Sequence, residues 1–97
     1  MKFISRSSLQ SPRASIYLQQ LCKHFGHKLE TSFNDEVGLI KFPYGDCHMA
    51  SEGELLELLI VTNIADDLER LERVVGSHLE RFAFREKHEL VWARDQL

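Results

Sequence analysis

Two stretches of the chain repeat apolar residues on a helical period. In the first, residues 12–25, the apolar positions follow one another at spacings of three, one, three, one and three: Ala14, Tyr17, Leu18, Leu21, Cys22 and Phe25. In the second, residues 64–82, the same kind of stripe is formed by Ile64, Leu68, Leu71, Val75, His78, Leu79 and Phe82. A stripe with a period of about 3.6 residues is typical of a helix with one buried face, so we predict helices over both stretches.

The chain between these helices alternates short apolar segments with turn residues. Turn-forming residues cluster at 34–36, 43–46 and 51–53, and they separate segments 29–33, 37–42, 47–50 and 55–61. Segment 55–61 also fits a helix, but Ile60, Val61 and Thr62 are β-branched and Asn63 can cap a new helix, so we interpret it as a strand. The regular turn spacing favours an antiparallel meander, and residues 1–9 and 89–94 are expected to add two further strands.

These elements predict one α+β domain over residues 1–97. We expect a two-layer structure, an antiparallel sheet with both helices on one face, in the order β-α-β-β-β-β-α-β. Residues 55–61 are apolar on both sides, with Leu56, Leu58 and Ile60 alternating with Leu55, Leu59 and Val61. Two helices can cover only one side of that strand. We therefore predict a homodimer formed through the sheet or a sheet edge, with an apolar ligand or the chain's own loops as the competing cover.

Charge and composition restrict the classes of partner. The net charge is −3, and it is uneven: residues 1–28 sum to +5, residues 29–67 to −8 and residues 68–97 to 0. Nucleic-acid binding needs a clustered basic surface, so a general nucleic-acid binder is not expected. The longest apolar run is 58–61, far short of a membrane span, and the first residues lack a signal-peptide core. With only two cysteines, Cys22 and Cys47, the expected compartment is the cytoplasm.

Four short motifs give the chain a resemblance to a known family. They are LCKHFGHK at residues 21–28, FPYGDC at 42–47, HLERFAFRE at 78–86 and LVW at 90–92. With these motifs the chain resembles a bacterial family known as domain of unknown function 2218, over nearly its whole length. The resemblance implies a stand-alone small bacterial protein without an assigned activity. It also implies a link to iron or siderophore handling.

Two histidines on the predicted helices are the first candidates for a ligand site. His78 lies on the apolar stripe of the second helix and His24 flanks that of the first, so the two can meet if the helices lie side by side. Arg81 and Arg85 are four residues apart, and with Lys87 and His88 they could hold a carboxylate or a phosphate. An exposed face paired with neighbouring glutamates is the simpler interpretation of these cations.

The two cysteines suggest two alternative functions, a metal-binding protein and a small enzyme. Cys22, His24 and His27 are metal-ligand types, but their spacing does not match a standard zinc site, so we expect no stoichiometric metal and no cofactor. The second alternative is a small enzyme that uses His24 or His78 together with Cys47. Cys47 is also a candidate ligand-binding residue if the protein is not an enzyme. No nucleophile or phosphate-loop motif occurs. The favoured hypothesis is thus a non-enzymatic accessory protein that binds a small molecule or a partner chain.

Overall fold

The structure, a computed structural model, describes residues 1–86 and 89–96 and confirms the α+β fold class. Its elements are β1 (Phe3–Gln10), α1 (Ala14–Phe25), β2 (Glu30–Phe33), β3 (Val37–Phe42), β4 (Gly45–Glu52), β5 (Leu55–Thr62), α2 (Ala65–Phe82), a 3-10 helix (Phe84–Glu86) and β6 (Ala93–Gln96). The element order β-α-β-β-β-β-α-β is the one expected from the sequence. None of the helices in this part of the chain is both long enough and apolar enough to cross a membrane.

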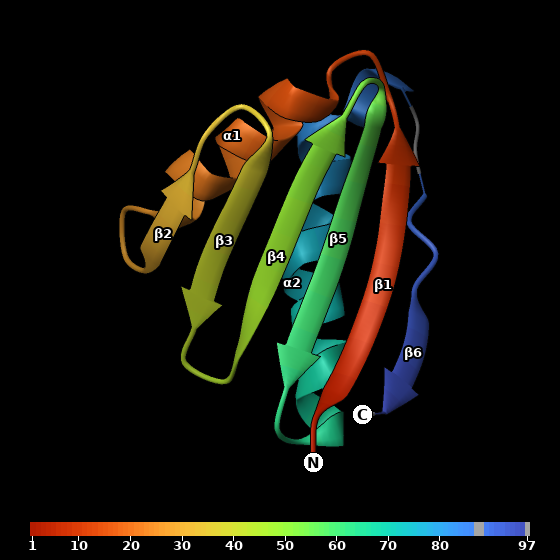
Figure 1. Cartoon of the computed structure of the whole chain (residues 1–97). Coiled ribbons are helices and arrows are strands. Elements are labelled where there is room, and N and C mark those ends of the chain that lie inside the picture. The colour runs from red at the N-terminus through yellow and green to blue at the C-terminus, as the bar shows by residue number, and fades with distance from the viewer. Residues whose placement is uncertain (87–88, 97) are drawn as a thin grey trace.

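All the strands belong to one six-stranded sheet with the order β2-β3-β4-β5-β1-β6. Every neighbouring pair of strands is antiparallel. The two helices lie on the same face of the sheet, behind it in the view of Figure 1. We call the opposite face, which neither helix covers, the open face.

Strand alternation puts the core between the helices and the sheet. On β5, Leu56 and Ile60 are fully buried toward the helices, whereas Leu59 on the open face is only half-buried. The buried stripes of α1 and α2 close over this layer. The largest fully buried side chains of the layer are Leu18, Leu21, Cys22, Ile40, Cys47, Leu56, Leu58, Ile60, Leu71, Val75 and Leu79.

Both helices begin slightly later than the sequence pattern indicated. The Ser11 hydroxyl accepts a hydrogen bond from the Arg13 N–H at 3.0 Å and so closes a turn ahead of α1. The predicted cap at Asn63 is wrong, because the N-cap residue of α2 is Ile64 and no side chain caps it. Just before the helix, Thr62 Oγ1 donates to the Ile64 carbonyl at 2.8 Å, which steadies the turn but caps no helix N–H group.

The last strand lies further along the chain than the predicted segment 89–94. Leu90 and Trp92 pack against the buried core, and β6 begins only at Ala93. Both side chains lie over Gly76 on α2, where an added Cβ atom would be 3.7 Å from Leu90 Cδ1 and from Trp92 Nε1. The apolar alternation in this segment therefore reflects packing on a helix and not pairing with a strand.

Candidate functional site

The structure brings His24 and His78 together. Their ring centroids are 4.8 Å apart, and the ring planes are tilted by 46°. Phe25 packs against both, with its centroid 5.1 Å from His24 and 4.9 Å from His78. Phe82 approaches His24 at 6.0 Å from the α2 side. The approach of the two histidines is the one that the two helical stripes suggested.

A hollow of about 450 Å³ opens beside His24 where α1 ends. We call it the helix-end pocket, and its lining residues are His24, Phe25, His27, Lys28 and Leu29. The backbone curls tightly here, since the N–H groups of Lys28 and Leu29 both donate to the Phe25 carbonyl, at 3.1 and 2.9 Å. Gly26 is the C-cap of α1, and its N–H donates to the Cys22 carbonyl at 2.8 Å. This turn wraps the side chains after the helix around the hollow.

The two histidines differ in how firmly they are held. His78 lies 2.7 Å from the Val74 carbonyl through Nδ1. A carbonyl only accepts, so Nδ1 carries a hydrogen and donates it to Val74, which fixes the orientation of the ring. His24 is exposed, yet its pKa is lowered by desolvation and then by the charges of His78, His27 and Arg81. His24 is therefore mostly neutral at pH 7.

The two arginines of the predicted anion site have different surroundings. Arg81, in the last turn of α2, lies close enough to His24 for its charge to lower the pKa of that imidazole. Arg85 lies in the 3-10 helix, with its guanidinium 5.6 Å from the centroid of the Phe84 ring. Lys87 and His88 fall outside the described residues. Of the predicted cations, Arg81 is thus the one that joins the histidine pair.

Both cysteines lie inside the core. Cys22 and Cys47 are fully buried free thiols, and burial raises the pKa of Cys22 to about 11 and that of Cys47 to about 12. A nucleophile needs a thiolate, so neither the ligand-binding nor the catalytic role suggested for Cys47 is favoured. Within residues 1–86 and 89–96, no group of three or more His, Cys, Asp or Glu side chains is arranged to hold a metal ion.

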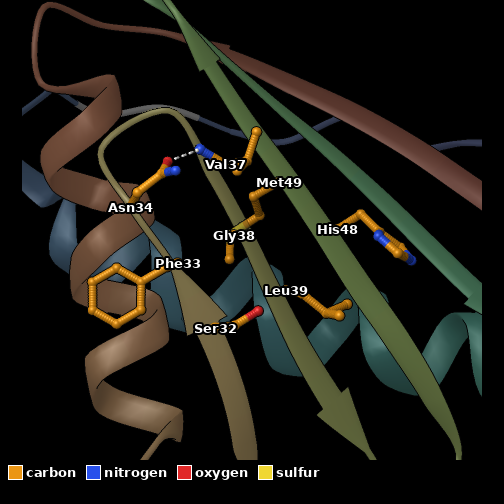
Figure 2. A pocket seen from close by; sticks show the side chains of 8 residues that line it. All are labelled: Ser32, Phe33, Asn34, Val37, Gly38, Leu39, His48 and Met49. Atoms are coloured by element: carbon orange, nitrogen blue, oxygen red, sulfur yellow. Dashed lines mark hydrogen bonds between the residues drawn. The ribbon is translucent and has the colours of Figure 1, made fainter.

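A second hollow, of about 600 Å³, lies toward the β2 edge of the sheet and was not anticipated from the sequence. Figure 2 shows it beside Leu39 and His48, with Asn34 accepting from the Val37 N–H at 2.8 Å. His48 also lines a smaller hollow of about 290 Å³, which continues toward Leu59 and Arg6. The exposed His48 thus lies between two depressions on the sheet surface.

Comparison with known proteins agrees with this architecture. A family model described as "uncharacterized protein conserved in bacteria (DUF2218)" matches residues 6–93. The chain belongs to the DUF2218 family. A solved member of the same fold, the NMR structure of PA4090 from Pseudomonas aeruginosa, is 32% identical over 94% of this chain and 95% of that chain, with a TM-score of 0.80. Comparison with curated proteins gives no match.

In this DUF2218 protein, sequence reasoning identified the histidines but not the pocket beside them. The sequence offers His27 as an alternative metal ligand or as a partner of the helix C-terminus, and it does not identify Lys28 and Leu29 as lining residues. The available signal was local: a helix that ends at a glycine and is followed at once by a histidine, a lysine and a leucine. Such a segment must fold back on the helix end, and its side chains then surround whatever space is left.

Proposed function

We propose that this protein is a non-enzymatic binding protein that holds a small ligand in the helix-end pocket. The observation that carries the proposal is the position of His24. His24 lines a hollow of about 450 Å³, and its ring centroid also lies 4.8 Å from that of His78 and 6.0 Å from that of Phe82. A concave site with apolar walls and a few convergent polar groups is the usual form of a ligand site.

The chemistry of the lining favours binding over catalysis. His78 is held through Nδ1 by the Val74 carbonyl, which orients its ring toward His24 and Phe25. A general base needs a positioned nucleophile or substrate proton, and the two thiols lie in the core. The link to iron or siderophore handling stays a prediction of the family resemblance, as does the expectation of no stoichiometric metal.

Fragment screening by NMR tests the proposal directly. Small aromatic and anionic fragments added to isotope-labelled protein should shift the backbone amides of residues 24–29 before any others. His24→Ala should weaken such binding at least about tenfold, which corresponds to about 1.4 kcal/mol.

His48→Ala is the matched control, because His48 is also exposed but lies on the open face. It should leave the affinity unchanged. Fragments that shift residues around His48, and leave residues 24–29 unaffected, would contradict the proposed site and move the function to the open face.

A further inference from the structure

The walls of the helix-end pocket are suited to a flat apolar body. Phe25 is half-buried, and its ring is braced at 5.2 Å by Phe42 and at 4.9 Å by His78. His24 stands edge-on to Phe25 at an interplanar angle of 84°, and Leu29 adds an aliphatic surface. Two rings meeting nearly at right angles form a corner in which a planar ring can make both stacked and edge contacts.

The charges around the pocket are suited to an anion. Lys28 lines the hollow and the charge of Arg81 acts on His24, whereas none of the described lining residues is acidic. The C-terminus of α1 opposes an anion with roughly −0.5 charge. Its Cys22 and Phe25 carbonyls, however, already accept hydrogen bonds from the turn that follows. Lys28 therefore places a permanent positive charge at the hollow, beside helix-end carbonyls that are already hydrogen-bonded.

An anion in this pocket would also change the protonation of His24. The charged or titratable groups around His24 are His78 and Arg81 from α2 and His27 and Lys28 from the turn, and His78, His27 and Arg81 lower the pKa of His24 by disfavouring a further positive charge. Phe25 and Phe82, its other neighbours, are uncharged. A bound carboxylate would supply the missing negative charge, so His24 should take up a proton when the ligand binds.

We infer that the ligand is a small planar aromatic acid, bound between Phe25 and Leu29 with its anionic group toward Lys28 and His24 and with the uptake of one proton. This inference rests on the proposed function, because it names the class of ligand for the same pocket. The affinity should rise as the pH falls through the range in which free His24 is neutral. The limit for one linked proton is about tenfold per pH unit.

Three probes separate the parts of this inference: 2-naphthoate, the uncharged 2-naphthamide, and inorganic phosphate. We expect 2-naphthoate to shift the backbone amide resonances of residues 24–29. It should bind several-fold more tightly at pH 5.5 than at pH 7.5. The amide and phosphate should each bind at least about tenfold more weakly, since one lacks the charge and the other the apolar body. Lys28→Gln should weaken 2-naphthoate equally at both pH values, whereas His24→Ala should remove the pH dependence.

The outcomes distinguish the ligand class from the site itself. If 2-naphthamide binds as tightly as 2-naphthoate, or if the affinity is the same at both pH values, the aromatic-acid inference is overturned and the pocket remains a ligand site. If phosphate binds as tightly as 2-naphthoate, the inference that the ligand contains an aromatic ring is wrong. If none of the three probes shifts residues 24–29 at millimolar concentration, both the inference and the proposed function are wrong. His48→Ala should change none of these affinities.

Discussion

Glu72 is a buried carboxylate that accepts hydrogen bonds from two other parts of the fold. It is 9% exposed and accepts a hydrogen bond from Ser5 Oγ at 2.6 Å. Arg94 binds both its carboxylate oxygens, at 2.8 and 2.7 Å. The Arg94 hydrogen bonds, and then that from Ser5, lower the pKa of Glu72 against the opposing effect of burial. This group ties α2 to β1 and β6, and it explains how the short final strand is attached.

Replacing Glu72 by Gln should therefore destabilise the protein in a pH-dependent way. At pH 7 we expect a loss of about 1–3 kcal/mol in the free energy of unfolding, limited because Arg94 is half exposed. Since the folded pKa of Glu72 is lowered, its contribution is present above the unfolded pKa, near pH 4, and is lost as the pH falls through the folded value. Urea unfolding at pH 7 and at pH 3 measures both effects.

Glu69→Gln is the control for this prediction, because its pair with Arg73 at 3.2 Å is largely exposed. It should cost less than about 0.5 kcal/mol at either pH. Two outcomes would contradict the view that the buried, charged Glu72 stabilises the fold. One is an equal loss of unfolding free energy in the two variants, and the other is a loss for Glu72→Gln that is no smaller at pH 3 than at pH 7.

The two thiols make a second prediction at the same scale. At pH 8 a thiol with a pKa of about 11 is only about 0.1% thiolate, against roughly a quarter for an ordinary cysteine. We expect Ellman's reagent to label Cys22 and Cys47 at least about 100-fold more slowly in the folded protein than in denaturant. Rapid labelling of Cys47 without denaturant would contradict this prediction and support the hypothesis of a catalytic Cys47.

At the scale of whole elements, periodicity was a good guide wherever one face of an element is buried against another. Both helices end at Phe25 and Phe82, as their stripes indicated, and segment 55–61 is a strand. Periodicity gave the wrong result at residues 89–92, where the alternating apolar residues predict a strand. Leu90 and Trp92 alternate like strand residues because they cover α2 from a loop.

Polar positions were harder to interpret than apolar ones. Glu72 occupies the buried stripe of α2, four residues after Leu68, and a carboxylate there signals a partner brought in by the fold. Its partners Ser5 and Arg94 are 67 and 22 residues away, so no local pattern could identify them. The helix-end pocket has the same origin, because its shape depends on how the turn after α1 folds back.

Two glycines test the packing of the helices on the sheet. At Gly38, on β3, an added Cβ atom would lie 2.9 Å from Cys22 Sγ and 3.0 Å from Leu18 Cδ2, both on α1. Gly38→Ala should therefore push α1 from the sheet and cost about 1–3 kcal/mol. Gly76→Ala is the matched variant, since its nearest atoms are at 3.7 Å, and it should stabilise α2 by up to about 1 kcal/mol.

Urea unfolding of both variants tests whether Gly38→Ala lowers and Gly76→Ala raises the free energy of unfolding. Each replaces glycine by alanine, so the change in the unfolded chain is similar and the difference reports the folded state. Stabilisation by Gly38→Ala would show that the contact between α1 and β3 is looser than described.

The molecule as a whole is asymmetric, with one covered and one uncovered sheet face. Strand register aligns Leu39, His48, Leu59 and Arg6 in a single row across the open face. The core side of β5 is fully buried, as expected, but Leu59 and Val61 on the other side are only half-buried and Val37 is 52% exposed. Within the described residues of one chain, no helix covers this surface. The predicted homodimer would cover it.

Charge placement on the open face favours a symmetric contact. Arg6 lies opposite Leu59 on the neighbouring strand, and Glu57 is two residues from Leu59 on β5. A two-fold axis running beside Leu59 would bring the two copies of this leucine together. If this axis runs diagonally to the strands in the plane of the contact, it places each Arg6 near the Glu57 of the other copy, so one patch with both signs of charge complements itself.

We therefore expect a dimeric mass by light scattering at about 100 μM, a concentration at which even a weak specific dimer is populated. Arg6→Glu would place two glutamates against each other across the axis, and it should shift the protein to monomer. The double variant with Arg6→Glu and Glu57→Arg exchanges the charges and should restore the dimer. Ile16→Lys is the control, since Ile16 is 43% exposed on α1, in the layer on the other side of the sheet. A monomeric mass for the unaltered protein would remove the dimer, and a dimer that survives Arg6→Glu would place the contact at a sheet edge instead.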